Sequence, residues 1–260
     1  MPPPNPLSLI SSSVLALAIA LPSASAAASG GYWYGMLGGW SYQARGSVTN
    51  GQQLDFQRDL GLRSTDRGDM ALGFAPTAAQ SPWIPTLDLS YFHFGERGRQ
   101  QLRTPLLFGL VELQSEAESS TDVDDLQLAL RWPWQLAQFR IYSGFNLTRL
   151  HGEVVVADAD TGQRNRQPVD EIFPSPSLSL AWQPLRTLRF NLRGDYIEYQ
   201  RQRAQTLEAG AYWQMLGPVG LELGWRQRRY NVESENEFGP YLLDARLSGI
   251  RFGLRFEIPR

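Results

Sequence analysis

Cysteine and lysine are both absent from the 260-residue sequence. Without cysteine the chain can form no disulfide framework, thiolate metal site or cysteine nucleophile. All 24 basic residues of the Lys+Arg count are therefore arginine, whose planar fork pairs with carboxylates bidentately, although a genomic composition bias would produce the same usage. The formal net charge of -2 gives no argument for nucleic-acid binding, and we expect none.

Familiar enzyme motifs and long amphipathic helices are missing as well. The sequence has no HExxH, GxSxG or P-loop pattern, which excludes the familiar soluble-enzyme classes that carry them. Hydrophobic residues nevertheless make up 42% of the chain and charged residues 19%, so it can fold around a substantial apolar surface.

The first 26 residues have the pattern of a secretory signal peptide. An apolar run from Leu7 to Leu21 is followed by Ala24-Ser25-Ala26, a small-x-small cleavage pattern. The preceding MPPPNP has no positive charge, which is unusual, and a membrane-anchoring helix is the alternative, but the run is shorter than the roughly 20 residues of a span. We expect cleavage after Ala26 and one domain over residues 27–260.

Alternation with a period of two residues runs through nearly all of the remaining chain. It predicts ten strands, at about 31–44, 64–75, 84–95, 120–132, 139–152, 172–183, 187–199, 203–214, 219–231 and 243–257. Short links with proline alternate with links that are mostly longer and polar, such as GSVTNGQQLDFQRDLGL and ADADTGQRNRQPVDE. This arrangement is typical of an up-and-down meander with an even number of strands.

Strand length and aromatic placement indicate that the apolar face of the strands points outward, against lipid. The predicted strands, at about 11 to 15 residues, suit a tilted bilayer crossing better than a soluble domain. Tryptophans gather at the short-turn ends and tyrosines toward the long loops, as in two aromatic girdles. The tryptophans are Trp33, Trp83, Trp132, Trp134, Trp182 and Trp213, and the tyrosines are Tyr42, Tyr91, Tyr196, Tyr199 and Tyr230. We therefore predict an all-β fold, a transmembrane antiparallel up-and-down β-barrel of about ten strands, with eight or twelve as alternatives.

The last predicted strand adds an outer-membrane signature. RFGLRFEI, with Gly253, Phe256 and Ile258 at its key positions, fits the polar-x-Gly-x-x-aromatic-x-hydrophobic pattern and resembles the C-terminal assembly signal of outer-membrane proteins. Such signals usually end on the aromatic residue, whereas Pro259 and Arg260 follow here. The pattern supports location in the bacterial outer membrane and recognition by the barrel assembly machinery.

With the apolar residues of each strand facing outward, alternate residues lie on the lipid side and in the lumen. In LRFNLRGDYIEY, for example, Leu188, Phe190, Leu192 and Tyr196 face lipid, while Arg189, Arg193 and Asp195 face inward. We predict a lumen ion-pair network, and expect the partners of this strand to be Glu208 and Glu222 or the arginines of the last strand. Its members are Arg189, Arg193, Asp195, Glu208, Glu222, Arg226, Arg251 and Arg255, with Asp88, Arg131 and Glu257 on the same inner face.

Four stretches, LDFQRDLGL, DVDDLQLALRW, SGFNLTRLHGEV and GWRQRRYNVE, together resemble a family of proteobacterial outer-membrane β-barrel proteins of unassigned function. The resemblance spans most of the mature chain. It implies a small barrel of ten or a similar number of strands and carries over no catalytic or binding residues.

The remaining candidates for chemistry are two histidines and two acidic clusters. His93 and His151 lie near the long-loop ends on strands that are not neighbours, and no Ser-His-Asp arrangement can be placed. Asp158–Gly162 (DADTG) and Asp122–Asp125 (DVDD) could hold Ca²⁺, but the EF-hand spacing is not met. We expect turn and rim roles, no metal and no cofactor.

The sequence thus predicts a monomeric outer-membrane protein with a largely side-chain-filled lumen and a structural, adhesive or unassigned envelope role. Its expected partners are outer-membrane lipids and lipopolysaccharide. A narrow solute channel and a lipopolysaccharide-modifying enzyme with a rim histidine stay open as alternatives.

Overall fold

A computed structural model describes residues 31–62, 65–76, 83–236 and 239–259 of the chain. The predicted signal peptide lies outside these residues. The strands are β1 (Gly31–Asn50), β2 (Gln52–Asp55), β3 (Thr65–Pro76), β4 (Thr86–Gln101), β5 (Leu106–Phe108), β6 (Val111–Leu113), β7 (Glu116–Leu136), β8 (Phe139–Asp158), β9 (Arg164–Leu185), β10 (Leu188–Tyr199), β11 (Gln202–Leu216), β12 (Val219–Asn236) and β13 (Gly239–Pro259). Within the described residues no helix is long and apolar enough to cross a membrane.

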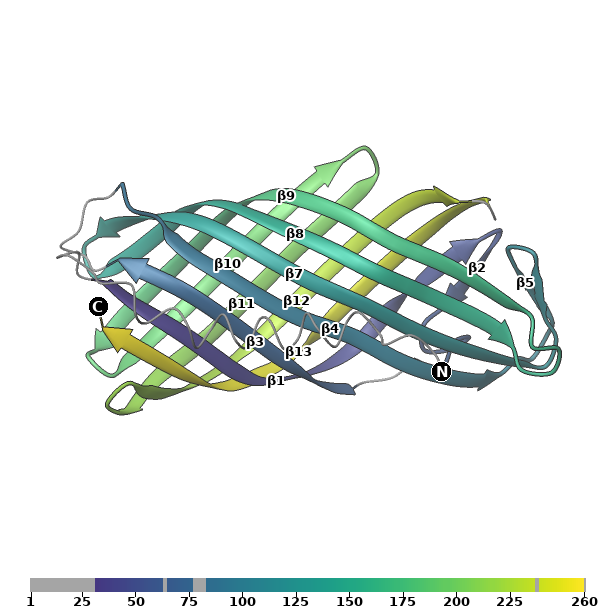
Figure 1. The fold of residues 1–260 in the computed structure, drawn as a ribbon, viewed down its shortest axis with the longest axis horizontal. Helices are drawn as coiled ribbons and strands as arrows, with labels where there is room; N and C mark the ends of the chain where they lie inside the picture. Colours follow the sequence, from purple (N-terminus) through teal and green to yellow (C-terminus); the bar gives the residue numbers. More distant parts are fainter. Residues whose placement is uncertain (1–30, 63–64, 77–82, 237–238, 260) are drawn as a thin grey trace, which may run out of the picture.

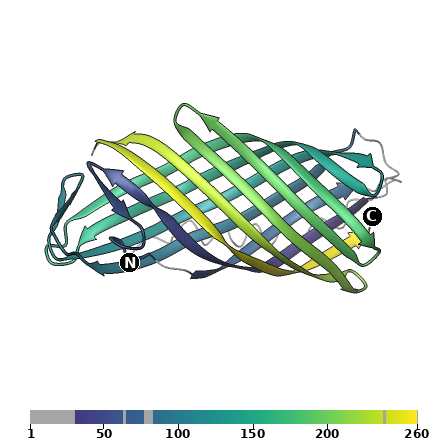
Figure 2. The ribbon, with the colours of Figure 1, turned by 180° about the vertical axis from the view of Figure 1, so that it is seen from behind.

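Ten of these strands form a closed antiparallel barrel. The order is β1-β3-β4-β7-β8-β9-β10-β11-β12-β13, and β13 pairs with β1 to close the ring, from Tyr32↔Pro259 to Thr49↔Leu242 (Figure 2). The short β2 pairs with the last residues of β1, beyond the part of β1 that pairs with β3. β5 and β6 form a separate hairpin at one end of the barrel (Figure 1). The predicted fold class and the count of about ten strands are confirmed.

The strands extend further on the long-loop side than predicted. β9 has 22 residues and β7 has 21, whereas a transmembrane strand needs about 9–11. The stretch ADADTGQRNRQPVDE, expected as a loop, is mostly the tops of β8 and β9 with a tight turn between Asp158 and Arg164. The wall formed by these strands is therefore longer than a bilayer crossing requires, and the long strands run the length of the barrel in Figure 1.

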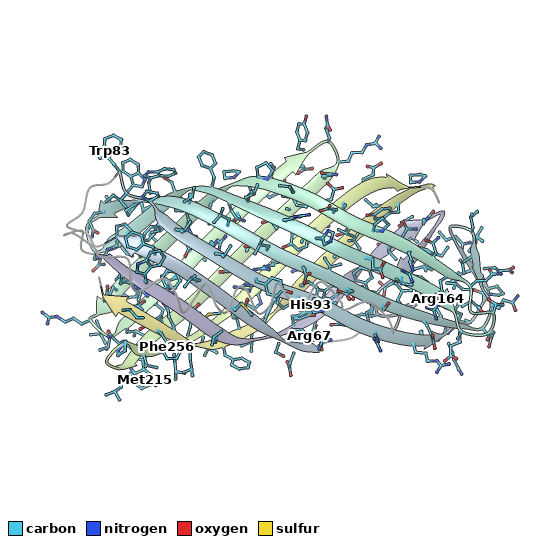
Figure 3. All side chains as sticks on the ribbon, in the orientation of Figure 1. Arg67, Trp83, His93, Arg164, Met215 and Phe256 are labelled. Carbon is cyan, nitrogen blue, oxygen red and sulfur yellow. The ribbon has the colours of Figure 1, made fainter. Side chains whose placement is uncertain are left out.

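An apolar belt surrounds the short-turn half of the barrel. Leucines, isoleucines and aromatic residues point outward there with about 37–66% of their surface exposed, and they come from nearly every strand of the ring. Members include Leu37, Leu130, Phe145, Leu178, Leu192, Leu223 and Phe252. Trp83, Met215 and Phe256 mark this end in Figure 3, and Arg164 marks the other. A belt of this kind is stable only against lipid.

The polarity of the two faces is exchanged where the wall leaves the belt. On β8, Phe145 and Leu147 face outward within the belt, but higher on the strand Val154 and Val156 face inward and are buried. The alternation continues, while the outer face now carries charges because it meets water. This exchange explains why the sequence of these upper segments looked like polar loops.

The tyrosine girdle is only partly present. Tyr196 and Tyr199 are exposed on the outer face, and Tyr91 is half-buried there. Tyr42 and Tyr230 instead point inward, with 1% and 5% of their surface exposed, and belong to the interior packing. The prediction that these two lie at the membrane interface is therefore wrong, because the inward phase of the upper wall is apolar.

Candidate functional site

The lumen is the first candidate, and its short-turn half contains a polar chamber. The cavity has a volume of about 180 Å³ and its lining includes Tyr32, Asp88, Arg131, Arg189, Glu222 and Arg255. Arg189 donates to Glu257 over 2.6 Å, and Arg131 is paired with Asp88. These charged side chains in the chamber lining therefore already have partners of opposite charge.

A charged layer closes the chamber on its inner side. Asp69, fully buried on β3, accepts hydrogen bonds from Arg226 at 2.9 Å and from Arg251. Arg226 also contacts Glu208 at 2.5 Å, and Arg251 contacts Glu222 at 2.5 Å. The layer is linked across the lumen, from β3 to β11, β12 and β13, so it is a cross-brace of the barrel wall.

The structure brings all eight predicted network residues into ion pairs, but the expected partners of β10 are wrong: Arg189 pairs with Glu257, and Arg193 and Asp195 pair with each other. Arg255 pairs with Glu222 of the neighbouring β12 at 3.4 Å and with Glu257, two residues along its own strand, at 2.9 Å. Arg193 pairs at 2.6 Å with Asp195, two residues along its own strand, and not with Glu208 or Glu222. Side chains at i and i+2 share a face of a strand, which makes this local pair possible.

Two carboxylates of the network, Asp69 and Asp125, were not predicted, whereas Arg228 shares the predicted inward phase of Glu222 and Arg226. Asp125 accepts hydrogen bonds from Arg228 and from Tyr230, each with a donor–acceptor distance of 2.5 Å. A signal was available in TDRGDMALGF, where Asp69 shares the inward phase with Ala71 and Gly73. With these additions, seven arginines (131, 189, 193, 226, 228, 251 and 255) contact seven carboxylates (69, 88, 125, 195, 208, 222 and 257).

An apolar core fills the lumen above the charged layer. Trp40 stands at the boundary, with the guanidinium groups of Arg226 and Arg228 at 5.3 and 5.6 Å from its ring centre. Its ring also packs on Tyr42 at 5.0 Å and on Phe92 at 4.8 Å. Valines and leucines of the upper strands complete this core, including Val123, Val154, Val169, Val232 and Leu243.

The segment that follows β1 enters this core, contrary to the prediction of a polar loop. Leu54, Phe56, Leu60 and Leu62 have no exposed surface. The Phe56 N–H donates to the carbonyl of Gly46 on β1 at 2.9 Å. Gly46 itself has a φ of 132°, which favours glycine, and a Cβ there would lie 1.8 Å from the Asp244 carbonyl oxygen. Residues 54–62 are called the inserted segment below.

A buried turn holds the inserted segment in place. The Asp59 carboxylate accepts from the backbone N–H of Asp55 at 2.9 Å and from the Arg58 guanidinium at 2.9 Å. Ser119 on β7 donates to the Leu60 carbonyl over 2.7 Å. These bonds satisfy polar groups of the segment, so its insertion leaves fewer of them unpaired in the apolar surroundings.

The two histidines lie on the outer wall, not in the lumen. His93 Nδ1 is 3.0 Å from Asp124 Oδ1, and His151 Nδ1 is 3.5 Å from Asp170 Oδ1. In the register of β4, β7, β8 and β9 the four residues form one cross-strand row, His93-Asp124-His151-Asp170. Each histidine thus has an acidic neighbour although the two do not touch each other.

The two acidic clusters are divided by the geometry of the wall. Within DVDD, Asp122 and Asp124 face outward beside His93, whereas Asp125 faces the lumen. Among the described residues no group of three metal-ligating side chains is found.

In DADTG, Asp158 closes the β8–β9 turn and ties it to the neighbouring loop. It accepts backbone N–H bonds from Gln114 and Thr161, each over 2.7 Å. These two bonds, that of Gln114 first, hold the pKa of the Asp158 carboxyl below its usual range.

The predicted girdle and assembly residues occupy the short-turn end of the barrel. Trp134 and Trp213 have 55% and 53% of their surface exposed, and Trp182 stacks on Phe190 with 5.5 Å between ring centres. Trp33 packs on Phe74, and the Trp132 indole donates to the Trp83 carbonyl. Phe256 and Ile258 face outward on β13, while Gly253 lies opposite Gly38 in the closing pair of strands.

An antiparallel barrel with an apolar outer belt and a polar lumen within it has the architecture of the transmembrane β-barrels of bacterial outer membranes. Solved structures of that class are similar in fold. The outer membrane protease OmpT of Escherichia coli matches with a TM-score of 0.50 and 9% identity, covering 88% of this chain and 97% of its own.

Two further matches are more distant. The translocator domain of the autotransporter NalP of Neisseria meningitidis has a TM-score of 0.42 and 10% identity, covering 96% and 95%. Ail, the attachment invasion locus protein of Yersinia pestis, has a TM-score of 0.37 and 8% identity, covering 89% and 100%. No family model and no curated protein matches the chain. The fold class is thereby shown, while the resemblance to the family of unassigned function stays a prediction.

Proposed function

We propose that the chain is a monomeric, non-catalytic protein of the bacterial outer membrane whose closed barrel carries a rigid wall and loops beyond the membrane, in a structural or adhesive envelope role. The observation that carries this proposal is the double closure of the lumen, first by the charged layer around Asp69 and then by the apolar core with the inserted segment. A solute would have to break buried ion pairs and displace packed leucines to pass.

The charge balance of the lumen supports the same proposal. Each of the seven arginines is within 4.0 Å of a carboxylate, and the seven carboxylates of the network balance their charge. Selective pores instead use rings of one charge or of carbonyl oxygens. The finer assignment to the resembled family of unassigned function is part of this proposal.

Single-channel recording in planar bilayers tests the proposal. The refolded chain is expected to give no steady conductance, and Arg251→Gln, which removes one brace, is expected to give at most brief openings because the apolar core remains. Steady conductance of the wild-type chain that changes in Arg251→Gln would overturn the closed lumen in favour of the narrow channel.

The outer-wall histidines favour one second candidate, a lipopolysaccharide-modifying enzyme. The pairs His93–Asp124 and His151–Asp170 each set a carboxylate beside an imidazole, which is half of a general-base arrangement. Lipid A mass spectra from cells expressing the wild type, His93→Ala and His151→Ala distinguish the two functions. Spectra identical to the empty-vector control support the non-catalytic proposal, and a mass change lost in either variant contradicts it.

A further inference from the structure

Three arginines form a continuous row on the outer wall, away from the lumen network. Arg45 on β1 lies directly opposite Arg246 on β13, and Arg246 lies directly opposite Arg229 on β12. All three belong to the outward phase, since their neighbours Ala44, Leu247 and Arg228 are buried inside. Neighbouring strands are about 4.8 Å apart, so the row places three guanidinium groups along a span of about 10 Å.

The charge of this arginine row is not neutralised by the protein. Arg229 pairs with Asp244 at 3.2 Å, but Arg246 donates to the neutral Gln227 amide at 2.6 and 3.1 Å, and Arg45 donates to the Gln43 amide at 3.1 Å. In the part of the chain that the structure describes, no carboxylate lies within 4.0 Å of Arg45 or Arg246. One carboxylate against three arginines leaves a local charge of about +2.

Like charges directly opposite each other destabilise a pair of strands. Elsewhere on the upper outer wall the arginines avoid this by facing acids, as Arg99 does with Glu116, Arg149 with Asp170 and Arg166 with Glu153. The arginine row departs from this arrangement. An anion shared between the three guanidinium groups would remove the repulsion, so the row is suited to an anionic ligand.

The height of the row relative to the apolar belt indicates where the anion comes from. Arg229 is four residues beyond Trp225, and Arg246 is four residues beyond Ile250, the last belt residues of their strands. Four residues are about 13 Å along a strand and about 10 Å along the membrane normal at a tilt of about 45°. Arginine side chains can bend down from there toward the headgroup layer.

A shallow apolar groove lies below the row on the same wall. It is lined on the lipid side by Ala209 and Ala211 of β11 between the larger Phe190, Leu223 and Ile250. In the barrel register Ala209 lies opposite Trp225, and Trp225 lies opposite Ile250, so the groove is on the strands that carry Arg229 and Arg246. Small side chains between large ones leave room for an acyl chain against the wall.

We propose that Arg45, Arg229 and Arg246 bind the phosphates of a lipid A-type glycolipid of the outer leaflet, with an acyl chain in the groove over Ala209 and Ala211. The local charge of about +2 matches a headgroup with two phosphates better than a phospholipid with one. This site deepens the proposed function, because it rests on the upper wall lying on the outer-leaflet side of the membrane.

The test is a binding titration of the refolded full-length chain in detergent micelles, with purified bis-phosphorylated lipid A as the probe. The variant Arg45→Gln/Arg229→Gln/Arg246→Gln removes the arginine row. The matched control Arg99→Gln/Arg149→Gln/Arg166→Gln removes the same charge from outer-wall arginines that have acidic partners. We expect the affinity to fall about tenfold or more in the row variant and to change by less than about twofold in the control.

Equal affinities of wild type and row variant, or an equal loss in both variants, would overturn the site. Dephosphorylated lipid A is expected to bind no better to the wild type than to the row variant. Ala211→Trp, which fills the groove, is expected to weaken lipid A binding; unchanged binding would show that the acyl chain is not held there. Competition by inorganic phosphate as strong as that by lipid A would show a free-phosphate site and would also contradict the proposal.

Heat-modifiable migration on SDS gels is measured for every variant, so that loss of binding is read only from folded barrels. Failure of the closed-lumen proposal would appear as conductance in the planar bilayer with lipid A binding intact. Failure of the lipid site would appear as unchanged binding with no conductance, so the two outcomes are distinguishable.

Discussion

Asp69 shows at the residue scale how the lumen is held together. Its carboxylate has no exposed surface and accepts from arginines on two different strands, β12 and β13, neither of which pairs with β3. A single buried carboxylate between two guanidinium groups thus links strands that share no backbone hydrogen bonds. Removing it leaves both arginines buried with less compensation, which is far more costly than losing a surface pair.

We therefore expect Asp69→Asn to destabilise the folded barrel by about 3–5 kcal/mol. Urea unfolding in lipid vesicles, followed by tryptophan fluorescence, measures the change. Asp66→Asn is the matched control, because Asp66 is an exposed residue of the same strand, and it is expected to change stability by less than about 0.5 kcal/mol. A similar effect of both substitutions would contradict the bracing role of Asp69.

Asp158 gives a pH dependence that can be followed at one turn. Its pKa is lower in the folded chain, so its contribution to stability is fully present above the ordinary value of about 3.9 and is lost as the pH falls below it. Amide hydrogen exchange at Gln114, corrected for the intrinsic rate, should therefore keep its protection at about pH 5 and lose it as the pH falls below about 4. In Asp158→Asn the protection should be low and independent of pH over this range; a wild-type profile in the variant would refute the assignment.

At the scale of elements, the inserted segment decides what the upper half of the barrel is. Its leucines and Phe56 pack with the inward side chains of the upper strands, which thereby enclose a core like that of a soluble protein. Phe56 is its largest side chain and is fully buried beside residues of the core cluster. The segment, which is part of the connection between β1 and β3, is thus held against β7 through Ser119 and against β4 beside Arg99.

Phe56→Ala is expected to destabilise the upper half by about 3–5 kcal/mol through the cavity that it leaves. Limited proteolysis of the refolded protein should cut within residues 52–62 faster than in the wild type, while the belt-embedded strands stay protected. Phe56→Leu, which keeps most of the volume, should lie between the two. Equal cleavage rates in all three proteins would show that the segment is not packed as described.

At the scale of the whole molecule, closure of the ring depends on β13. This strand pairs with both β1 and β12 along almost its full length, and its outward residues Phe252, Leu254, Phe256 and Ile258 complete the apolar belt. A polar change on this face affects both insertion and closure. The C-terminal pattern around Phe256 is also the region proposed to be recognised by the assembly machinery.

The wild-type chain is expected to show heat-modifiable migration on SDS gels and to fractionate with the outer membrane. Phe256→Asp should abolish both, because a carboxylate on the lipid face is unfavourable and the aromatic residue of the signal is lost. Phe256→Leu keeps the lipid-facing side chain apolar and should separate the two causes: it retains insertion in vitro but assembles less efficiently in cells. If both the wild-type chain and Phe256→Leu were found as soluble proteins in the periplasm, the membrane-spanning fold would be contradicted.

The sequence by itself determined the strand phase, an even number of about ten strands and most of the charged residues of the lower lumen. These follow from local alternation, because a period of two residues assigns each side chain to a face wherever one face must be apolar. The sequence identifies residues such as Arg255 and Glu222 as lumen residues. It does not show which ion pairs form, because that depends on the register between strands.

Only the tertiary structure decided what lies above the membrane. There the outer face meets water and the inner face is apolar, so the same alternation that marks a lipid-facing strand below marks a soluble-type wall above, and Tyr42 and Tyr230 point inward. The place of the inserted segment and the register that aligns Arg45, Arg246 and Arg229 come from contacts between residues far apart in the chain. No local pattern encodes them, because they exist only once the ring has closed.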